Sequence, residues 1–406
     1  MDTSNINGLN LRISLKDADA VKSVKEEVWK EYLDEIRKDT VRVKEVEECA
    51  MAYGDAVMKY GMQIIGEPEE GGYPLYIALH GGGHSDTPHM NDSQWKHMFI
   101  YYRDSVKAGI YINPRGVRDT WDTHGNPESY PLYDRLIMNM TAFQNVNPNR
   151  VYLLGFSAGG DGVYMTAPKM ADRFAAFNMS AGHPNGIDLT NLYHTPIALQ
   201  VGMKDIAFNR HLVTPEYGKK LDELSRKYGG GFVHETYVHK DKGHNFHDNK
   251  EEEQWVLEDP EAFLEGKESA SRLCDTNAVR YISRYEREPL PKRVVWDLSN
   301  RAGLRTIESF YWLSARNIGN GGLIIAAADK ATNTINIEPG TTVKEFTVLL
   351  NEDMLDLFRP ITVVSPEGLS KEVMVETDYN LLKKTTWERG DKNYQFAAKI
   401  EYDTVF

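Results

Sequence analysis

Short apolar runs alternate with longer amphipathic segments from residue 56 to about residue 285, and this alternation restricts the fold more than any other feature of the sequence. The short runs are rich in β-branched and aromatic residues and too short for helices, so each is expected to form a buried strand. A chain in which strands and helices alternate forms a parallel sheet with helices on both faces. The predicted fold class is therefore α/β, with a doubly wound, mostly parallel sheet.

Turn and capping residues set the expected boundaries of these elements. The predicted strands are 56–66, 74–80, 109–116, 151–155, 174–184 and 196–205, and residues 232–244 are predicted to be a strand followed by a loop. The predicted helices are 92–107, 130–143, 158–171, 214–228 and 276–286.

The two ends of the chain differ from this region and predict three parts. Residues 1–48 form an N-terminal helical extension, whose apolar positions on a charged background predict an amphipathic helix packed on the main domain. Residues 49–288 form the main domain, in which the long acidic stretch 245–275 is expected to be a rim or lid insertion. Residues 289–406 are short β-rich runs between turn signals, with one helical stretch at 380–389, and predict a β-sandwich-like domain.

One predicted strand runs directly into Gly155-Phe156-Ser157-Ala158-Gly159, and a segment of helical character follows. A serine at the apex of such a strand–turn–helix has a strained backbone and an exposed hydroxyl, and the glycines let strand and helix pass closely. Ser157 is therefore the candidate nucleophile. By itself the motif also fits an ordinary turn with a solvated serine.

Two further strands end in residues that would complete a catalytic set. Asp205 lies at the C-terminal end of the predicted strand at 196–205, and His244 lies at the end of the predicted strand and loop at 232–244. A serine needs a base to become nucleophilic, and that base needs an acid to orient it, so Ser157, Asp205 and His244 are the predicted nucleophile, acid and base. Three residues compete for these roles: His247 with His244, and Asp241 and Asp161 with Asp205.

The strand at 74–80 ends in His80-Gly81-Gly82-Gly83, a glycine-rich loop whose backbone N–H groups can face a developing oxyanion. The predicted oxyanion donors are the amides of Gly82 or Gly83 together with that of Ala158. His80 is interpreted as a residue that fixes the loop rather than as a base.

The polar loop after the strand at 109–116 is the predicted substrate wall, because loops at this edge of a doubly wound sheet lie over the ligand. It contributes Arg115, Arg118, Trp121 and His124, and Phe156 beside the serine joins them. Trp121 would be an apolar or sugar-stacking platform. In the alternative interpretation, the two arginines pair with acidic neighbours such as Asp119, Asp122 and Glu128.

Residues from about Ala56 to Glu286 resemble the α/β-hydrolase family. Leu-His-Gly-Gly-Gly with Gly-Phe-Ser-Ala-Gly-Gly-Asp-Gly is most similar to the branch that contains polyhydroxybutyrate-depolymerase-like and feruloyl-type esterases. The resemblance implies an α/β-hydrolase fold. With the ordered Ser, Asp and His, it leads us to expect a serine carboxylic-ester hydrolase acting on a small-molecule or oligomeric ester.

Three alternatives stay open at this stage. A serine peptidase of the prolyl-oligopeptidase kind uses the same residues, although no propeller precedes the main domain here. A catalytically silent binding protein would keep the fold with His244 turned away from Ser157, or with the site filled by residues 245–275. Acyl transfer to an acceptor other than water needs no further residue.

Composition argues against other partners. The net charge of −13 would not attract nucleic acid over long range, and no window is apolar enough to span a membrane. The first residues lack the pattern of a signal peptide, so a cytoplasmic protein is expected, with secretion after signal removal as the alternative. Cys49 and Cys274 imply no disulfide framework. A homo-oligomer is neither predicted nor excluded.

No cofactor is expected, and no metal. Two clusters combine imidazole and carboxylate: His84, Asp86 and His89, and His244, His247 and Asp248. Neither has the spacing of a standard metalloenzyme motif, and the second contains the predicted base.

Overall fold

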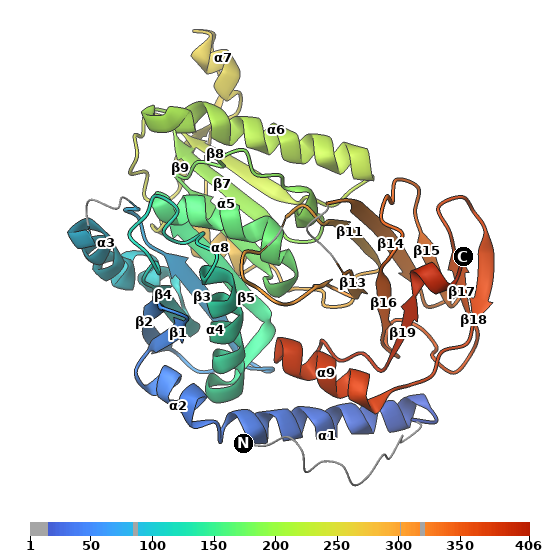
Figure 1. Cartoon of the computed structure of the whole chain (residues 1–406). Helices are drawn as coiled ribbons and strands as arrows, with labels where there is room; N and C mark the ends of the chain where they lie inside the picture. Colours follow the sequence, from blue (N-terminus) through green and yellow to red (C-terminus); the bar gives the residue numbers. More distant parts are fainter. Residues whose placement is uncertain (1–14, 84–87, 301, 317–320) are drawn as a thin grey trace. The chain divides into compact units, whose positions relative to one another are not determined.

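The computed structural model describes residues 15–83, 88–300, 302–316 and 321–406 (Figure 1). Contacts between residues divide the chain into two compact units. The larger contains residues 37–289 and 295–306, and the smaller contains the described residues up to Ile36, then Leu290–Val294 and those from Ile307 to Phe406.

The described part of the larger unit holds one ten-stranded sheet. In spatial order its strands are β1 (Ala50–Tyr53), β2 (Ala56–Ile65), β4 (Gly109–Pro114), β3 (Tyr73–Leu79), β5 (Val146–Phe156), β6 (Ala176–Ser180), β7 (Ile197–Gly202), β8 (His234–His239), β9 (Gln254–Leu257) and β10 (Ser271–Cys274). The strands from β4 to β8 run parallel, and antiparallel strands extend both edges. The predicted mostly parallel sheet is confirmed, and each strand predicted for it is present.

Helices cover both faces of this sheet, which is why its central strands are buried along almost their whole length. The helices of the larger unit are α2 (Thr40–Glu47), α3 (Pro88–Tyr101), α4 (Ser129–Gln144), α5 (Ala158–Met170), α6 (Arg210–Tyr228), α7 (Pro260–Leu264) and α8 (Ala278–Ile282). Short 3-10 turns are η2 (Arg103–Ser105), η3 (Ala171–Arg173), η4 (Thr190–Leu192) and η5 (Ala207–Asn209).

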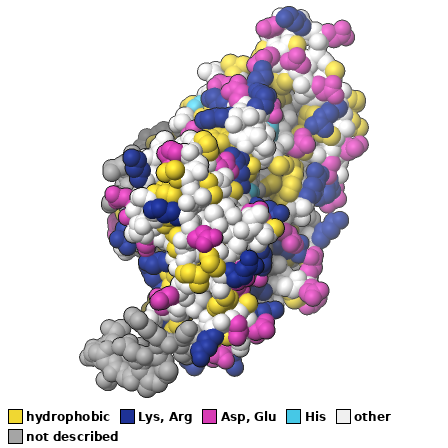
Figure 2. Space-filling model, turned by 90° about the vertical axis from the view of Figure 1, so that its right-hand side faces the viewer, with side chains coloured by type: hydrophobic (Ala, Val, Ile, Leu, Met, Phe, Trp, Pro, Cys, Tyr) yellow, Lys and Arg dark blue, Asp and Glu magenta, His cyan; other side chains and the backbone are white. Residues whose placement is uncertain are grey.

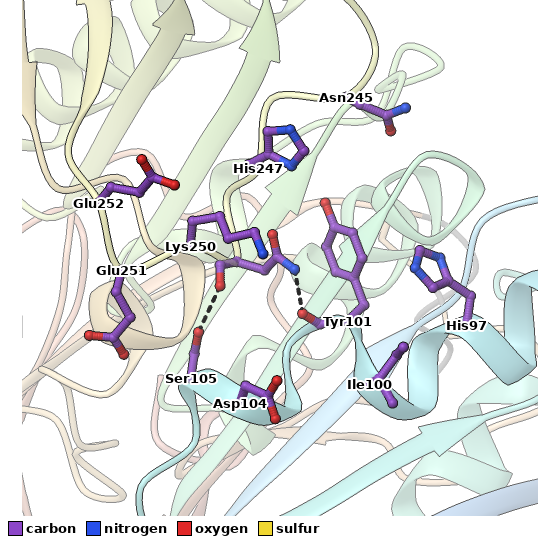
Figure 3. Close-up of a pocket in the computed structure, with 11 residues that line it drawn as sticks. His97, Ile100, Tyr101, Asp104, Ser105, Asn245, His247, Lys250, Glu251 and Glu252 are labelled. Atoms are coloured by element: carbon purple, nitrogen blue, oxygen red, sulfur yellow. Dashed lines mark hydrogen bonds between the residues drawn. The ribbon is translucent and has the colours of Figure 1, made fainter.

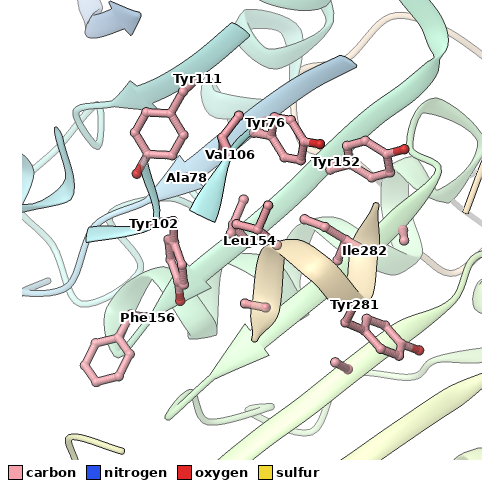
Figure 4. Close-up of a cluster of buried hydrophobic side chains, with 14 of the residues drawn as sticks. Tyr76, Ala78, Tyr102, Val106, Tyr111, Tyr152, Leu154, Phe156, Tyr281 and Ile282 are labelled. Atoms are coloured by element: carbon pink, nitrogen blue, oxygen red, sulfur yellow. The ribbon is translucent and has the colours of Figure 1, made fainter. Parts of the chain in front are cut away.

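One face of the sheet carries an aromatic core, drawn in Figure 4. Tyr76 and Tyr152 stack there with ring centroids 5.1 Å apart, and Met98 of α3 and Ile282 of α8 belong to the same cluster. Leu79 points the other way, because side chains alternate along a strand, and Gly162 of α5 lies against it. Strand β5, which ends directly before Ser157, is thus held between two helical layers.

Two helix starts differ from the prediction. α3 begins at Pro88 rather than at Asp92, since proline suits a first helical turn. α6 begins at Arg210 rather than at a Thr214 cap, because the backbone N–H of His211 donates to the carbonyl oxygen of Asp205 at 3.2 Å and fixes the start of the helix.

The predicted insertion at 245–275 contributes two short strands to the sheet. β9 and β10 pair antiparallel with each other, and β9 joins β8 where Val256 faces His239. The first residues of the predicted insertion, 245–253, form no strand or helix.

The smaller unit contains helices α1 (Ala18–Ile36) and α9 (Tyr379–Arg389) and the 3-10 turn η7 (Tyr402–Thr404). Its described strands form two sheets. One contains β11 (Arg293–Asp297), of which only Arg293 and Val294 belong to this unit, with β14 (Leu323–Asp329), β15 (Thr334–Ile337), β17 (Ile361–Val364) and β18 (Ser370–Val373). The other contains β12 (Ser309–Phe310), β13 (Leu313–Ser314), β16 (Thr347–Leu350) and β19 (Ala398–Glu401). The change to short strands after residue 289 was predicted from the sequence.

The N-terminal extension differs from its prediction, because its described residues, 15–48, are divided between the two units. α1 belongs to the smaller unit, where the ring of Tyr32 meets Trp387 of α9 edge-on with centroids 5.4 Å apart. α2 belongs to the larger unit. The apolar stripe of α1 predicted a buried face but could not say which surface covers it.

Lysine, arginine and acidic side chains are interspersed on the face that Figure 2 shows, with hydrophobic side chains between them. Among the described residues of this face we see no continuous basic field of the kind that nucleic-acid backbones attract. Within the part of the chain that the structure describes, no helix is both long and apolar enough to cross a bilayer.

Candidate active site

Ser157 sits between the end of β5 and the start of α5 with φ 59° and ψ −122°, a conformation that a residue with a side chain rarely adopts. Its N–H donates to the carbonyl oxygen of Ser180 at 2.9 Å. A Cβ added at Gly155 would lie 2.2 Å from the carbonyl oxygen of Gly159, and one at Gly159 would lie 2.1 Å from that of Leu79. The glycines therefore let strand and helix pass closely enough to force this bend.

The structure brings the three predicted catalytic side chains together. His244 Nε2 lies 3.0 Å from Ser157 Oγ, and His244 Nδ1 lies 2.7 Å from Asp205 Oδ2. Asp205 follows β7 and is only 3% exposed. Because a carboxylate only accepts, Nδ1 carries the proton, so Nε2 is free to accept the hydroxyl proton of Ser157.

The three rivals lie elsewhere. Asp241 is exposed and pairs with Lys204 at 3.1 Å. Asp161, in the first turn of α5, accepts the backbone N–H of His183 at 2.7 Å. His247 lines a pocket, and its side chain makes no hydrogen bond to Ser157.

The glycine loop after β3 lies against the start of α5. Gly82 and Gly83 have φ of +104° and +97°, and a Cβ at Gly83 would meet the side chain of Ala158 at 3.0 Å. The N–H of Gly83, however, donates to Asn91 Oδ1 at 2.6 Å, so it is already used. The prediction that Gly83 could donate its N–H to the oxyanion is therefore wrong. The N–H groups of Gly82 and Ala158, the other predicted donors, have no partner among the described residues.

Two buried histidines, His80 and His124, hold the glycine loop in place by hydrogen bonds. His80 donates from Nδ1 to the carbonyl oxygen of Gly81 at 2.6 Å and accepts the N–H of Gly116 at Nε2 at 3.0 Å. Burial lowers the pKa of His80 to about 4, so the ring is neutral. His124 donates from Nε2 to the carbonyl oxygen of His80 at 2.9 Å, is 1% exposed, and has its pKa lowered by burial. His124 was predicted to line the substrate wall and instead holds the loop in place.

The arginines of the predicted substrate wall pair with acidic side chains, as the alternative interpretation proposed. Arg115 pairs with Asp92 at 3.0 Å and also with Asp119, which accepts from Asn91 Nδ2 at 2.6 Å. Arg115 therefore supports the side chain that holds the Gly83 amide.

Arg118 pairs with Asp55 at 2.8 Å and with Glu128 at 2.6 Å. Its pKa is raised, because both carboxylates accept from its guanidinium and stabilise the charged form. We find no geometry that directs Arg118 toward Ser157.

Trp121 and Phe156 lie near the reacting groups. Trp121 is 58% exposed, and its carbonyl oxygen lies beside Gly83, since a Cβ there would meet it at 2.9 Å. The Phe156 ring lies 5.2 Å from His244 and 5.4 Å from Tyr101, measured between centroids. A role of either residue in the predicted substrate wall stays a prediction.

A pocket of about 940 Å³ opens beside these residues, and Figure 3 draws its lining. Ser157, Asp205 and His244 are not among its lining residues, but the lining includes Asn245, which directly follows His244 in the chain, and Tyr101, whose ring contacts Phe156. Its lining comes from α3, η2 and the segment 245–252: His97, Ile100, Tyr101, Asp104, Ser105, Asn245, His247, Asn249, Lys250, Glu251 and Glu252. The sequence predicted a rim in 245–275 but gave no signal for the residues of α3.

No group of three or more metal-ligating side chains gathers among the described residues. Of the first predicted cluster, His84 and Asp86 lie outside the described residues. In the second, Asp248 is buried and accepts from Tyr101 and Tyr102 rather than facing His244.

Comparisons with known proteins give partial matches. No family model matches the chain. A bifunctional acetylxylan esterase/xylanase of Neocallimastix patriciarum is 31% identical over 114 residues, which are 28% of this chain. The match spans only 16% of that protein's length.

Solved structures resemble the chain weakly. A poly(3-hydroxybutyrate) depolymerase of Bordetella parapertussis is 16% identical, with 61% of this chain and 99% of that chain covered and a TM-score of 0.41. The esterase PE8 is 18% identical, with 46% and 91% covered and a TM-score of 0.33.

Proposed function

We propose that this chain is an α/β-hydrolase and a serine carboxylic-ester hydrolase, with the larger unit as its catalytic domain. The observation that carries the proposal is the hydrogen-bond chain from Ser157 through His244 to Asp205, built on a strained turn. The 114-residue likeness to a protein with acetylxylan esterase activity supports an ester as the substrate.

In the first half of the reaction, His244 Nε2 takes the Ser157 hydroxyl proton while Oγ attacks the ester carbonyl carbon. The C–O bond to the alcohol then breaks, and His244 returns the proton to the leaving alcohol oxygen. Asp205 holds the imidazole in the tautomer that makes Nε2 the acceptor and stabilises its protonated form. The products of this half are a free alcohol and an acyl group on Ser157.

In the second half, water replaces the alcohol. His244 removes a proton from the water as its oxygen attacks the acyl carbon, and the proton passes to Ser157 Oγ as the acyl bond breaks. The carboxylic acid leaves, and the serine hydroxyl is restored.

The negative oxygen formed in each half needs fixed donors. The N–H of Ala158 at the start of α5 and that of Gly82 are the groups we assign to it, each contributing roughly 3 kcal/mol to lowering the barrier. The positive end of the helix dipole of α5 adds to the field at the same place.

The pocket beside Asn245 gives room for one side of the ester, and exposed Trp121 gives an apolar surface near the glycine loop. A small-molecule or oligomeric ester fits this arrangement. One form of the silent-protein alternative has His244 turned away from Ser157, and the 3.0 Å distance between Nε2 and Oγ argues against that form.

Hydrolysis of p-nitrophenyl acetate and butyrate, and labelling by a fluorophosphonate, test the proposal. Ser157→Ala and His244→Ala should each abolish turnover, with the circular dichroism spectrum retained. His234→Ala is the matched control, because His234 lies at the opposite end of β8, where its ring contacts the carbonyl oxygen of Phe232 and the side chain of Asp222. A wild-type protein that neither hydrolyses these esters nor takes up the label would refute the proposal.

A further inference from the structure

A buried carboxylate lies behind the candidate catalytic residues. Asp248, four positions after His244, is fully buried, and three hydroxyl groups donate to it. They belong to Tyr101 at 2.9 Å, Tyr102 at 2.7 Å and Ser180 at 2.5 Å. Burial raises the pKa of Asp248, and the three donors oppose that rise by stabilising the charged form.

Ser180, the last residue of β6, connects this carboxylate to the nucleophile. Its carbonyl oxygen accepts the N–H of Ser157 at 2.9 Å, and its hydroxyl donates to Asp248 at 2.5 Å. The same hydroxyl accepts from Asn178 Nδ2 at 2.9 Å, which fixes its direction. One residue thus holds the strained serine by its backbone and the histidine segment by its side chain.

The segment from His244 to Asp248 has little freedom of its own. Phe246 is fully buried and stacks on His239, with ring centroids 4.4 Å apart and an interplanar angle of 19°. The carbonyl oxygen of Asp248 accepts the N–H of Ala278 at 2.8 Å. His244 therefore projects from a segment anchored at two successive points.

The polar chain continues into the sheet. Asn178 Oδ1 accepts from Gln200 Nε2 at 2.8 Å, and Gln200 Oε1 lies 3.0 Å from His239 Nε2. All three side chains are fully buried on adjacent parallel strands. Apolar side chains at these positions would have a lower free-energy cost of burial, because removing a carboxylate from water is unfavourable. A buried carboxylate therefore contributes geometric specificity rather than stability.

We propose that Asp248 and Ser180 are a positioning pair that sets the distance between His244 Nε2 and Ser157 Oγ. In this proposal neither residue contacts the reacting atoms. Asp248 acts through the segment that carries His244, and Ser180 acts through the turn that carries Ser157. The inference rests on the proposed esterase function.

Ser180→Ala and Tyr102→Phe test the pair without changing the charge. Each removes one hydroxyl donor to Asp248, and Ser180→Ala leaves the backbone bond to Ser157 in place. A displacement of about 1 Å at reacting atoms can cost roughly 100-fold in rate, so we expect kcat for p-nitrophenyl acetate to fall by about tenfold or more in each, with KM unchanged. The rate of fluorophosphonate labelling should fall in parallel.

Tyr281→Phe is the matched control. Tyr281 belongs to the same aromatic core as Tyr102, is 1% exposed, and donates a hydrogen bond to the carbonyl oxygen of Ile197 at 3.1 Å. Removing this hydroxyl in Tyr281→Phe should lower the melting temperature about as much as Tyr102→Phe does, but should leave kcat within about twofold of wild type. Ser180→Thr, which restores a hydroxyl, should recover more activity than Ser180→Ala.

Equal kcat values in wild type, Ser180→Ala and Tyr102→Phe would overturn the inference while leaving the esterase proposal intact. An equal loss of kcat in Tyr281→Phe would also overturn it, since the effect would then be one of core stability. An inactive, unlabelled wild-type protein would instead overturn the proposed function.

Discussion

The strained backbone at Ser157 predicts that removing its Cβ stabilises the protein. A residue with φ 59° and ψ −122° carries strain of about 1–3 kcal/mol, because only glycine adopts this region without steric cost. Ser157→Gly should relieve the strain, whereas Ser157→Ala keeps the Cβ and so keeps it. Both variants lose the bond to His244, so that loss cancels when the two are compared.

The expected difference is the relieved strain less the entropy that glycine adds to the unfolded chain. The entropy term is about 0.4–1 kcal/mol. Ser157→Gly should therefore be more stable than Ser157→Ala by about 1 kcal/mol, or roughly 2–4 °C in melting temperature for a unit of this size.

Thermal and urea unfolding of the two purified variants measure this difference, and p-nitrophenyl acetate turnover checks that both are inactive. We expect both to lose at least about 10⁴-fold in kcat, because nothing replaces the nucleophile. If Ser157→Gly unfolds at the same or a lower temperature than Ser157→Ala, the turn is not strained in solution and the reasoning about its presentation of the hydroxyl fails.

Three further outcomes are expected. Gly159→Ala should cost about 3 kcal/mol or more in urea unfolding, since its Cβ would lie 2.1 Å from the carbonyl oxygen of Leu79, and a loss below about 1 kcal/mol would contradict the close packing. His80 has its folded pKa lowered to about 4 from 6.5, so its neutral form contributes stability that is complete above pH 6.5 and is lost toward pH 4, up to about 3 kcal/mol; His80→Gln should flatten that part of the profile. Trp121→Ala should raise KM for aromatic esters and leave the melting temperature unchanged. Arg118 pairs with Asp55 and Glu128, so Arg118→Ala should leave both KM and kcat within about twofold of wild type. Equal effects of the two substitutions on KM would show that both residues contact the substrate.

Local features of this protein could be predicted from the sequence because they depend on neighbouring residues. The apolar runs gave the strands from β2 to β8, and the glycines around Ser157 indicated the sharp turn that the structure has. The order of Ser157, Asp205 and His244 placed three side chains at strand ends, and parallel strands bring their carboxyl ends to one edge. That geometric rule is why their proximity could be expected before any coordinates.

Interactions between distant residues could not be predicted in the same way. The pairing of Arg115 with Asp92 spans 23 positions, and the sequence offered several acidic side chains as equal partners. His124 looked like a loop residue open to a ligand, but the structure buries it beneath His80. From the sequence, Asp248 was considered only as one of three side chains, with His244 and His247, that could bind a metal ion.

By itself, then, the sequence determined the alternation of strands and helices, the bend at Ser157 and the order in which the candidate catalytic residues meet the sheet edge, since each follows from periodicity and backbone sterics over a few residues. Only the tertiary structure decided which surface covers α1, that the Gly83 amide is held by Asn91, and that Ser180 joins the serine turn to Asp248. These depend on which polar groups are buried together, and a buried donor takes whichever acceptor the folded chain brings within about 3 Å, however far away it lies in the sequence.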